Sequence, residues 1–460
     1  MRKTYKSIIP LGFLLLTCFG LGGCTGGASP PASLPAPVSQ LISVGNPDSI
    51  GLVSVFGAAG SVLPNALVRA QNLTQTAANS SWMDLLIPLA MAQGSDPTVS
   101  VEADNLGQFE LGIKADVGDT ILVQQLLDGE QSPNVDLKVN GNVVRLPVLP
   151  RGFTEPEPGL LSVTGAMEKS PDGELFDIDF AENPSPPSFP AAVQTFNACP
   201  GINGVVIDAE DGLGSLLCKE NESLVNFSPD GDIMAQFQEI DGVRFIGGRP
   251  ERNQGVLGVA KIDASVVTFN TATGSLQCDY LIPHPGGKAK HLQTTRAEWL
   301  DLDNTGVDSV LLALSQYDDG SWVLTRFQPL DCTNFAILNQ MELPADLNPF
   351  DMDGYQFGEQ ALISIPDSNR VLLVDLDRDT FASIPVGKSP LGVAVSQNQS
   401  TAYVVNNDDN SLTRIDLLTL ATNDIPAVGI FPTQIQLLES LGLGTVLSSG
   451  DRAVVTFPLD

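Results

Sequence analysis

The chain has 460 residues, of which 43% are hydrophobic and 17% charged, a composition suited to a globular fold rather than to disorder. Asp and Glu number 54 against 23 Lys and Arg, and the formal net charge of -31 excludes nucleic acids and anionic membrane surfaces as partners attracted by charge. Two histidines leave little material for a His-rich metal site, and 43 Gly with 33 Pro predict many turns and few long helices.

Residues 1–23 have the pattern of a secretion signal, with basic residues first and then an apolar stretch over residues 8–19 that is too short for a stable membrane span. The tetrapeptide Leu21-Gly22-Gly23-Cys24 resembles the lipobox of bacterial lipoproteins. This resemblance implies that the signal peptide is removed and that Cys24 is lipidated. The alternative is a plain signal peptide cleaved nearby. Removal of residues 1–23 would take away three basic residues and no acidic ones, so the mature charge would be 20 minus 54, or -34.

Residues 24–40 are almost entirely Gly, Ala, Ser and Pro after the cysteine, which predicts an extended tether. In the enteric sorting pattern an Asp directly after the lipid-bearing cysteine retains the protein at the inner membrane, whereas here the residue is Thr25. We therefore expect a lipid-anchored protein of the cell envelope, on the outer membrane or the cell surface. Its membrane contact would be made by the N-terminal lipid and not by charge.

Residues 41–150 predict a small β domain, with strands at 52–56, 66–70, 99–103, 108–111 and 120–126 and turns at 57–60, 104–107 and 118–119. This order of strands, Gly-containing turns and a core aromatic residue resembles the transthyretin-like, or carboxypeptidase regulatory-like, β-sandwich. The resemblance implies a packing, spacing or adhesion module without catalytic residues. An apolar insertion over residues 81–91 would either cover the open end of the sandwich or form an exposed contact for a partner or the membrane.

An internal repeat follows, because residues 360–376 align without gaps with residues 401–417 at an offset of 41, which also carries Asn410 onto Asp451. A period of about 40 residues with several strands is typical of propeller blades. The segments 390–395 (PLGVAV) and 404–406 (VVN) resemble YVTN-type β-propeller repeats. The fold class is thus all-β: a sandwich followed by a β-propeller over residues 151–460, with seven blades favoured within a range of six to eight. Because the last unit stops early, a strand from the start of the array should complete it.

Four cysteines remain after the signal peptide and Cys24: Cys199, Cys218, Cys278 and Cys332. An even number in an exported protein is consistent with disulfides. Three pairings are possible, and the shorter loops favour Cys199 with Cys218 and Cys278 with Cys332. Free buried thiols are the alternative.

The segment 301–308 (DLDNTGVD) resembles the calcium loops of integrin-type propeller repeats and of EF-hands. The resemblance makes Asp301, Asp303 and Asp308 candidate calcium ligands, and calcium is the one cofactor that the sequence suggests. Thr305 and Ser309 depart from the family's acidic positions, so a turn that satisfies its own backbone is the alternative. A second acidic segment, residues 349–354, is interpreted as a turn.

Catalytic motifs are missing from the sequence: it has no G-x-S-x-G, no phosphate-binding loop and no dinucleotide fingerprint, and both histidines, His284 and His291, lie in a predicted loop over residues 283–292. We expect no enzyme but a binding scaffold, whose propeller takes up an unknown protein or glycan ligand. A propeller hydrolase or lactonase and a calcium-stabilised structural envelope protein are the alternatives.

Overall fold

A computed structural model describes residues 34–74, 98–166, 173–196, 202–207, 214–218, 223–228, 233–237, 245–247, 256–260, 265–270, 276–287, 289–301, 309–331, 334–344, 347–426 and 428–459. Apart from short helical turns, the regular elements within these residues are β-strands, which confirms the predicted all-β class. None of the described helical turns is long and apolar enough to cross a membrane. The apolar insertion predicted over residues 81–91 lies outside the described residues.

The N-terminal domain is a sandwich of two antiparallel sheets, and its strands overlap those predicted. One sheet has the order β1 (Ile42–Val44), β2 (Leu52–Gly57) and β5 (Phe109–Lys114). The other has the order β4 (Thr98–Glu102), β3 (Leu67–Asn72), β6 (Thr120–Leu127) and β7 (Glu130–Gln131), with β8 (Val135–Lys138) also paired to β6. Alternate apolar side chains of both sheets, such as Val55 and Val123, meet in one core.

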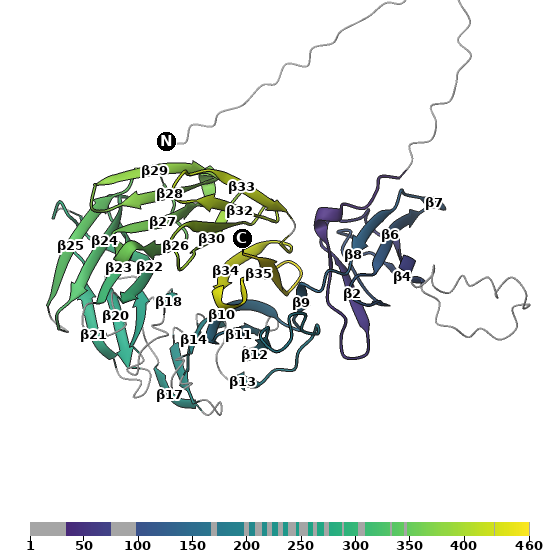
Figure 1. Cartoon of the computed structure of the whole chain (residues 1–460), viewed down its shortest axis with the longest axis horizontal. Coiled ribbons are helices and arrows are strands. Elements are labelled where there is room, and N and C mark those ends of the chain that lie inside the picture. Colours follow the sequence, from purple (N-terminus) through teal and green to yellow (C-terminus); the bar gives the residue numbers. More distant parts are fainter. Residues whose placement is uncertain are drawn as a thin grey trace, which may run out of the picture.

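The second domain is a ring of seven four-stranded antiparallel sheets, the blades of a propeller (Figure 1). Blade 1 contains β10 (Leu149–Glu157), β11 (Leu160–Ala166), β12 (Gly173–Asp179) and β13 (Gln194–Phe196). Blade 2 contains β14 (Ile202–Ile207), β15 (Gly214–Cys218), β16 (Ser223–Phe227) and β17 (Ile233–Phe237). Blade 3 contains β18 (Phe245–Gly247), β19 (Val256–Ala260), β20 (Ser265–Asn270) and β21 (Leu276–Leu281). Blade 4 contains β22 (His291–Asp301), β23 (Ser309–Tyr317), β24 (Trp322–Pro329) and β25 (Phe335–Glu342). Blade 5 contains β26 (Met352–Tyr355), β27 (Gln360–Ile365), β28 (Arg370–Asp375) and β29 (Thr380–Pro385). Blade 6 contains β30 (Pro390–Val395), β31 (Thr401–Asn406), β32 (Ser411–Asp416) and β33 (Thr422–Pro426), and blade 7 starts with β34 (Pro432–Leu438), β35 (Leu443–Ser448) and β36 (Ala453–Pro458).

Packing between blades explains why the repeat strands are continuously apolar. Strand β31 is buried at all of its positions. Its even-numbered residues, such as Val404, pack against Leu362 of blade 5, while Tyr403 and Val405 pack against Phe457 of blade 7. Both faces of a blade are therefore core, as the unbroken apolar runs in the sequence require.

Two asparagines of the repeat have the same structural role. Asn369 and Asn410 each adopt a left-handed conformation with φ of 53° at the hairpin between the second and third strands of a blade. Their Oδ1 atoms accept N–H groups of the next inter-blade loop, from Ser389 at 3.0 Å and Phe431 at 2.9 Å. In blade 7 the left-handed residue is Arg452, so the predicted equivalence of Asn410 with Asp451 is wrong by one residue.

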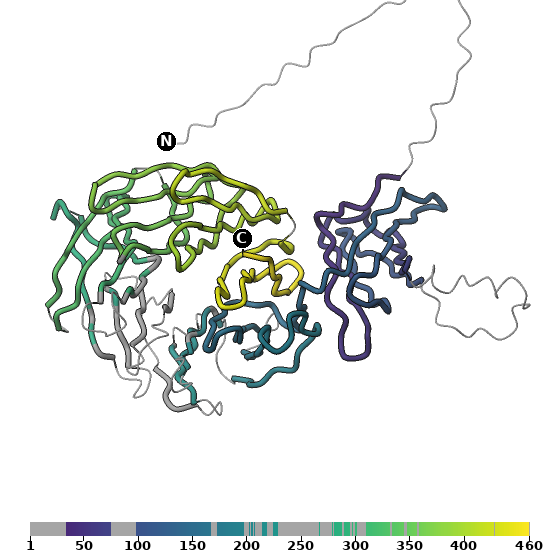
Figure 2. Tube along the Cα trace, in the orientation of Figure 1, coloured from purple at the N-terminus to yellow at the C-terminus, as the bar shows by residue number. Residues whose placement is uncertain are grey.

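Strand β9 (Val143–Arg145) pairs with β36 and supplies the fourth strand of blade 7, so the ring is closed as predicted by a strand from the start of the array. Both β9 and the first residues of β10 precede residue 151, where the sequence placed the start of the propeller. The trace in Figure 2 shows the consequence: the purple and blue sandwich lies beside the yellow C-terminal blade.

Candidate functional site

Several of the predicted site residues lie outside the described part of the chain: Cys24, Cys199, Asp303, Asp308 and Cys332. Asp301 is the last residue of β22. Cys218 and Cys278 are both disulfide-bonded and so are not free thiols, and their expected partners Cys199 and Cys332 stay a prediction. Among the described residues, no group of three or more His, Cys, Asp or Glu side chains is placed to hold a metal ion.

The two histidines lie together at one end of blade 4, against the ring of Tyr317. His284 and His291 both meet that ring edge-on, at centroid distances of 4.9 and 5.5 Å. His284 is in the loop between β21 and β22, as predicted, but His291 is the first residue of β22 and not part of a loop. Burial raises the pKa of Tyr317 to about 12, so its hydroxyl keeps its proton at neutral pH.

Near His284 the fold brings a serine and an aspartate together, which the sequence did not reveal. His284 Nε2 is 3.2 Å from Ser321 Oγ, and Ser321 Oγ donates to Asp319 Oδ1 at 2.6 Å. His284 Nδ1 accepts the N–H of Gly286 at 2.9 Å, so in the neutral ring the proton is on Nε2, which then donates to the serine.

This polarity is the reverse of what nucleophilic catalysis needs. A catalytic serine must donate its proton to the imidazole, whereas Ser321 donates to the carboxylate and receives a hydrogen bond from the ring. The two hydrogen bonds from Ser321 lower the pKa of Asp319, which lies at the surface. We therefore interpret His284, Ser321 and Asp319 as a polar turn network.

The second acidic segment is not a turn, because Asp353 lies on β26 and both of its aspartates bond to the next blade. Asp351 Oδ2 accepts the N–H of Val393 at 3.2 Å, and Asp353 Oδ2 accepts that of Val395 at 2.5 Å. Both N–H groups belong to β30, the innermost strand of blade 6. From the sequence, the two aspartates at alternate positions are interpreted as part of a turn. In the structure their spacing is instead that of side chains on one face of an extended strand.

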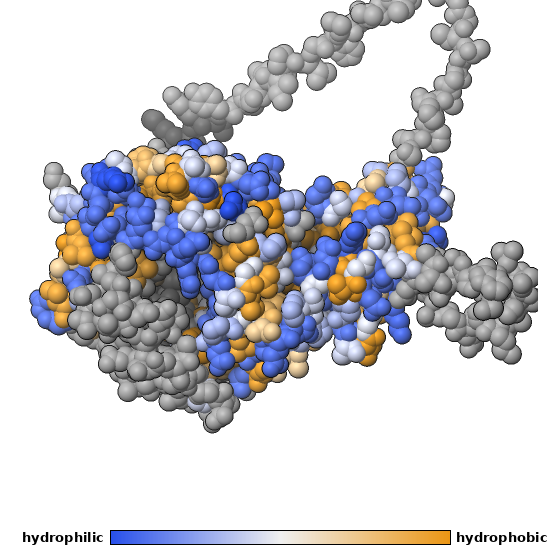
Figure 3. All heavy atoms as spheres, in the orientation of Figure 1, coloured by the Kyte–Doolittle hydropathy of each residue, from blue (hydrophilic) through white to orange (hydrophobic). Residues whose placement is uncertain are grey.

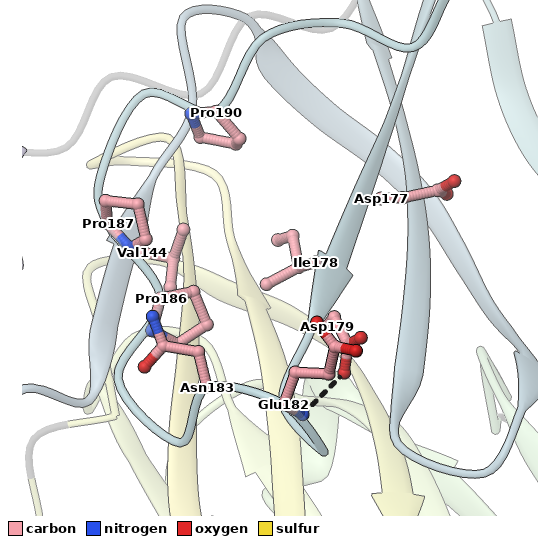
Figure 4. Close-up of a pocket in the computed structure, with 9 residues that line it drawn as sticks. All are labelled: Val144, Asp177, Ile178, Asp179, Glu182, Asn183, Pro186, Pro187 and Pro190. Carbon is pink, nitrogen blue, oxygen red and sulfur yellow. Dashed lines mark hydrogen bonds between the residues drawn. The ribbon is translucent and has the colours of Figure 1, made fainter. Parts of the chain in front are cut away.

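A pocket of about 250 Å³ lies where blade 1 meets the closing strand β9 (Figure 4). Its lining residues are Val144, Asp177, Ile178, Asp179, Glu182, Asn183, Pro186, Pro187 and Pro190. The carboxylate of Asp179 accepts the N–H of Glu182 at 2.9 Å, and Asp177 accepts the hydroxyl of Ser162 at 2.6 Å. Three carboxylates, one amide and three prolines thus make up most of the lining.

The contact between the sandwich and the propeller contains a buried charged network. Arg145 of β9 is 1% exposed; its Nη1 donates to Ser54 Oγ at 2.7 Å, and its Nη2 is 3.5 Å from Glu110 Oε1. Its guanidinium also lies 4.8 Å from the centre of the Phe56 ring. Ser54, Phe56 and Glu110 belong to the sandwich, so one propeller side chain contacts two of the three strands of this sheet, β2 and β5.

Asp451 lies close to this network and is completely buried. Its Oδ1 accepts the hydroxyl of Ser448 and the N–H of Ile430. Burial raises the pKa of Asp451, while the nearby charge of Arg145 counteracts the rise. Burial likewise lowers the pKa of Arg145, which the charges of Glu110 and Asp451 oppose. The guanidinium of Arg145 therefore favours the ionised form of Asp451, against the effect of burial.

No protein-family model matches the chain, and a search of curated proteins finds no similar sequence.

Proposed function

We propose that the chain is a lipid-anchored protein of the cell envelope whose propeller is a non-enzymatic scaffold that binds a protein or glycan. The observation that carries this proposal is the attachment of the propeller to the last residue of the predicted tether and the residue after it, Gln40 and Leu41. The carbonyl oxygen of Gln40 accepts a hydrogen bond from Asn410 Nδ2 at 3.1 Å, and Leu41 packs with Phe56, Ala58 and Ile430. A lipid on Cys24 would thus hold a whole propeller, and not a loosely linked domain, at the membrane.

The two domains support the same proposal. We propose that the sandwich belongs with the carboxypeptidase regulatory-like modules and the propeller with the YVTN-type repeats, on the residues that resemble those families. On the face seen in Figure 3, polar side chains cover much of the described propeller surface, with apolar groups interspersed. Such a mixed surface is typical of non-obligate protein and glycan partners.

The anchor is tested with Cys24→Ser. We expect this variant to incorporate no labelled fatty acid and to leave the membrane fraction, because the polyanionic body has no charge attraction to lipid. Cys18→Ser, within the apolar stretch of the signal, is the matched control and should stay anchored. Equal membrane fractions for Cys24→Ser and the unaltered protein would contradict the proposal.

Cross-linking of the anchored protein in cells tests the scaffold role. A protein or glycan species should be recovered with this protein in larger amounts than with an unrelated lipoprotein. Equal recovery with the two lipoproteins would count against the scaffold role.

A hydrolase is the alternative, and the contact between His284 and Ser321 is the observation that favours it. We expect Ser321→Ala to leave any hydrolysis of a panel of esters and lactones unchanged, because the hydrogen-bond polarity makes this serine a poor nucleophile. A loss of about 100-fold or more in both Ser321→Ala and His284→Ala would establish the hydrolase instead.

A further inference from the structure

The strand that closes the ring, β9, is three residues long and lies at the outer edge of the blade 7 sheet. Its central residue, Val144, is opposite Val454 of β36. Flanking bonds on either side extend this pairing: the N–H of Thr456 donates to the carbonyl of Asn142 at 2.8 Å, and the N–H of Leu146 donates to the carbonyl of Arg452 at 2.7 Å. In a strand the backbone groups of the alternate residues, Val143 and Arg145, then point outward. So short an edge strand has little pairing of its own to hold it.

The outward N–H and carbonyl groups of Val143 and Arg145 are all hydrogen-bonded. Both groups of Val143 bond to one residue of the sandwich, Asn46. Asn46 donates its N–H to the carbonyl of Val143 at 2.7 Å, and its Oδ1 accepts the N–H of Val143 at 3.1 Å. Arg145 is held by blade 1, where Ser188 Oγ accepts its N–H at 3.2 Å and the N–H of Phe189 donates to its carbonyl at 2.7 Å. The outer edge of the ring is thereby covered by the sandwich and the first blade together.

Asn46 also links the two sides of the seam between blade 7 and blade 1. Its Nδ2 donates to the carbonyl of Pro186, in the loop after β12, at 2.7 Å and to that of Gly141 at 3.2 Å. The residue is 1% exposed. A side chain at the preceding residue, Gly45, would come within 3.0 Å of Arg145 Cγ and Ser188 Oγ, so the sandwich backbone lies directly on the seam.

We propose that the sandwich is the latch of the propeller ring: through Asn46 it holds the closing strand against β36 and ties it to blade 1. Detachment of the sandwich removes both hydrogen bonds between Asn46 and the outward groups of Val143, leaves the Val143 carbonyl with the Ser188 hydroxyl at 3.5 Å, and weakens the closure of the ring. This role is separate from the anchor and from ligand binding, and it stands or falls independently of the proposed function.

Hydrogen–deuterium exchange of the full chain tests the latch, with Asn46→Ala as the variant. Peptides that cover residues 143–145 and 453–455 should exchange roughly tenfold to a hundredfold faster than in the unaltered protein, because bonds on both sides of the seam are lost. Peptides of β27 and β28, in blade 5, should not change. The matched control is Asn348→Ala, which removes an exposed asparagine bonded only at the surface, to Asp367 at 3.3 Å.

Asn46→Asp keeps an acceptor for Val143 but places a buried carboxylate against the carbonyl oxygens of Pro186 and Gly141. Exchange at β9 and β36 should therefore be at least as fast as in Asn46→Ala, and unchanged exchange in β27 and β28 shows that a variant is folded. Unchanged exchange at these strands would overturn the latch. So would an equal acceleration in β27 and β28, because that pattern reports a general loss of stability and not a local opening of the ring.

Discussion

Arg145→Ala should lower the free energy of unfolding by about 3–5 kcal/mol, the loss typical of removing one partner from a buried charged network. The variant removes the cation near the buried Asp451 and the bonds of Arg145 to Ser54 and Glu110, whereas Arg452 of blade 7 still lies 3.5 Å from Glu110 Oε2. It also removes the guanidinium that packs on Phe56. Urea denaturation measures this change in the free energy of unfolding. The slope of that free energy against urea concentration should be the same in the variant and the unaltered protein, so that the shift in midpoint reports stability.

Arg378→Ala is the matched control, since Arg378 bonds to Asp375 at 3.0 Å but its side chain is 78% exposed. A surface pair of this kind contributes no more than about 1 kcal/mol. Equal losses for the two arginines would show that Arg145 has no special part in joining the domains.

The pH dependence of the stability of Arg145→Ala follows from the titration of Asp451. Its pKa is raised above the ordinary value of 3.8, so the folded chain binds this proton more tightly than the unfolded chain does. Its contribution to stability is therefore full below that ordinary value and is lost as the pH rises through the raised pKa. Without Arg145 the pKa should rise further, because the cation lowers it. We expect the deficit of Arg145→Ala to be smaller at about pH 5 than at about pH 8. A deficit that grows as the pH falls would contradict this assignment, and Asp451→Asn should remove the trend.

Gly444→Ala should also destabilise the protein, by about 1–3 kcal/mol, through overpacking in blade 7. Gly444 on β35 is directly opposite Phe457 on β36, and a Cβ at this glycine would overlap the phenylalanine ring. The ring is 5% exposed and packs on Tyr403 of blade 6 at a centroid distance of 5.4 Å, so it has little room to move. Thermal unfolding of the variant checks the prediction.

A second substitution separates overpacking from other effects of Gly444→Ala. Phe457→Leu destabilises the chain alone, but it makes room for the added methyl group, so the double variant should be more stable than the sum of the two changes predicts. Additive losses would mean that the ring does not constrain this glycine. The same pairing of a glycine with a phenylalanine across two strands recurs at Gly57 with Phe109 and at Gly214 with Phe227.

Local patterns predicted much of the fold from the sequence. Alternation gave the strands of the sandwich, and the turn at residues 104–107 is made as its composition suggests, with Asp104 Oδ1 accepting the N–H groups of Leu106 and Gln108. The repeat with an offset of 41 corresponds to β27 and β28 against β31 and β32, residue for residue. Because each blade cannot bury its faces alone, the repeat also implied the ring and its closure.

Contacts between distant segments were not predictable in this way. Asn46 and Arg145 look like ordinary polar residues in short segments, and only the folded chain shows that they meet β9, blade 1 and the sandwich at once. Strand β9 is too short to have a period of its own. The pocket of blade 1 is lined by residues of β9, of β12 and of a proline-rich loop, which are distant in the sequence. The direction of the hydrogen bond between His284 and Ser321 depends on which nitrogen of His284 accepts the Gly286 N–H, which the sequence does not show.

We expect the sandwich and the propeller to form one rigid unit beside the tether. A pulsed electron paramagnetic resonance measurement of the distance between spin labels at Glu130→Cys, in the sandwich, and Arg378→Cys, in blade 5, tests this expectation, since both side chains are exposed. We predict a single narrow distance distribution, and a broader one when Arg145→Ala is added. A broad distribution in the unaltered background, the same with and without Arg145, would contradict it.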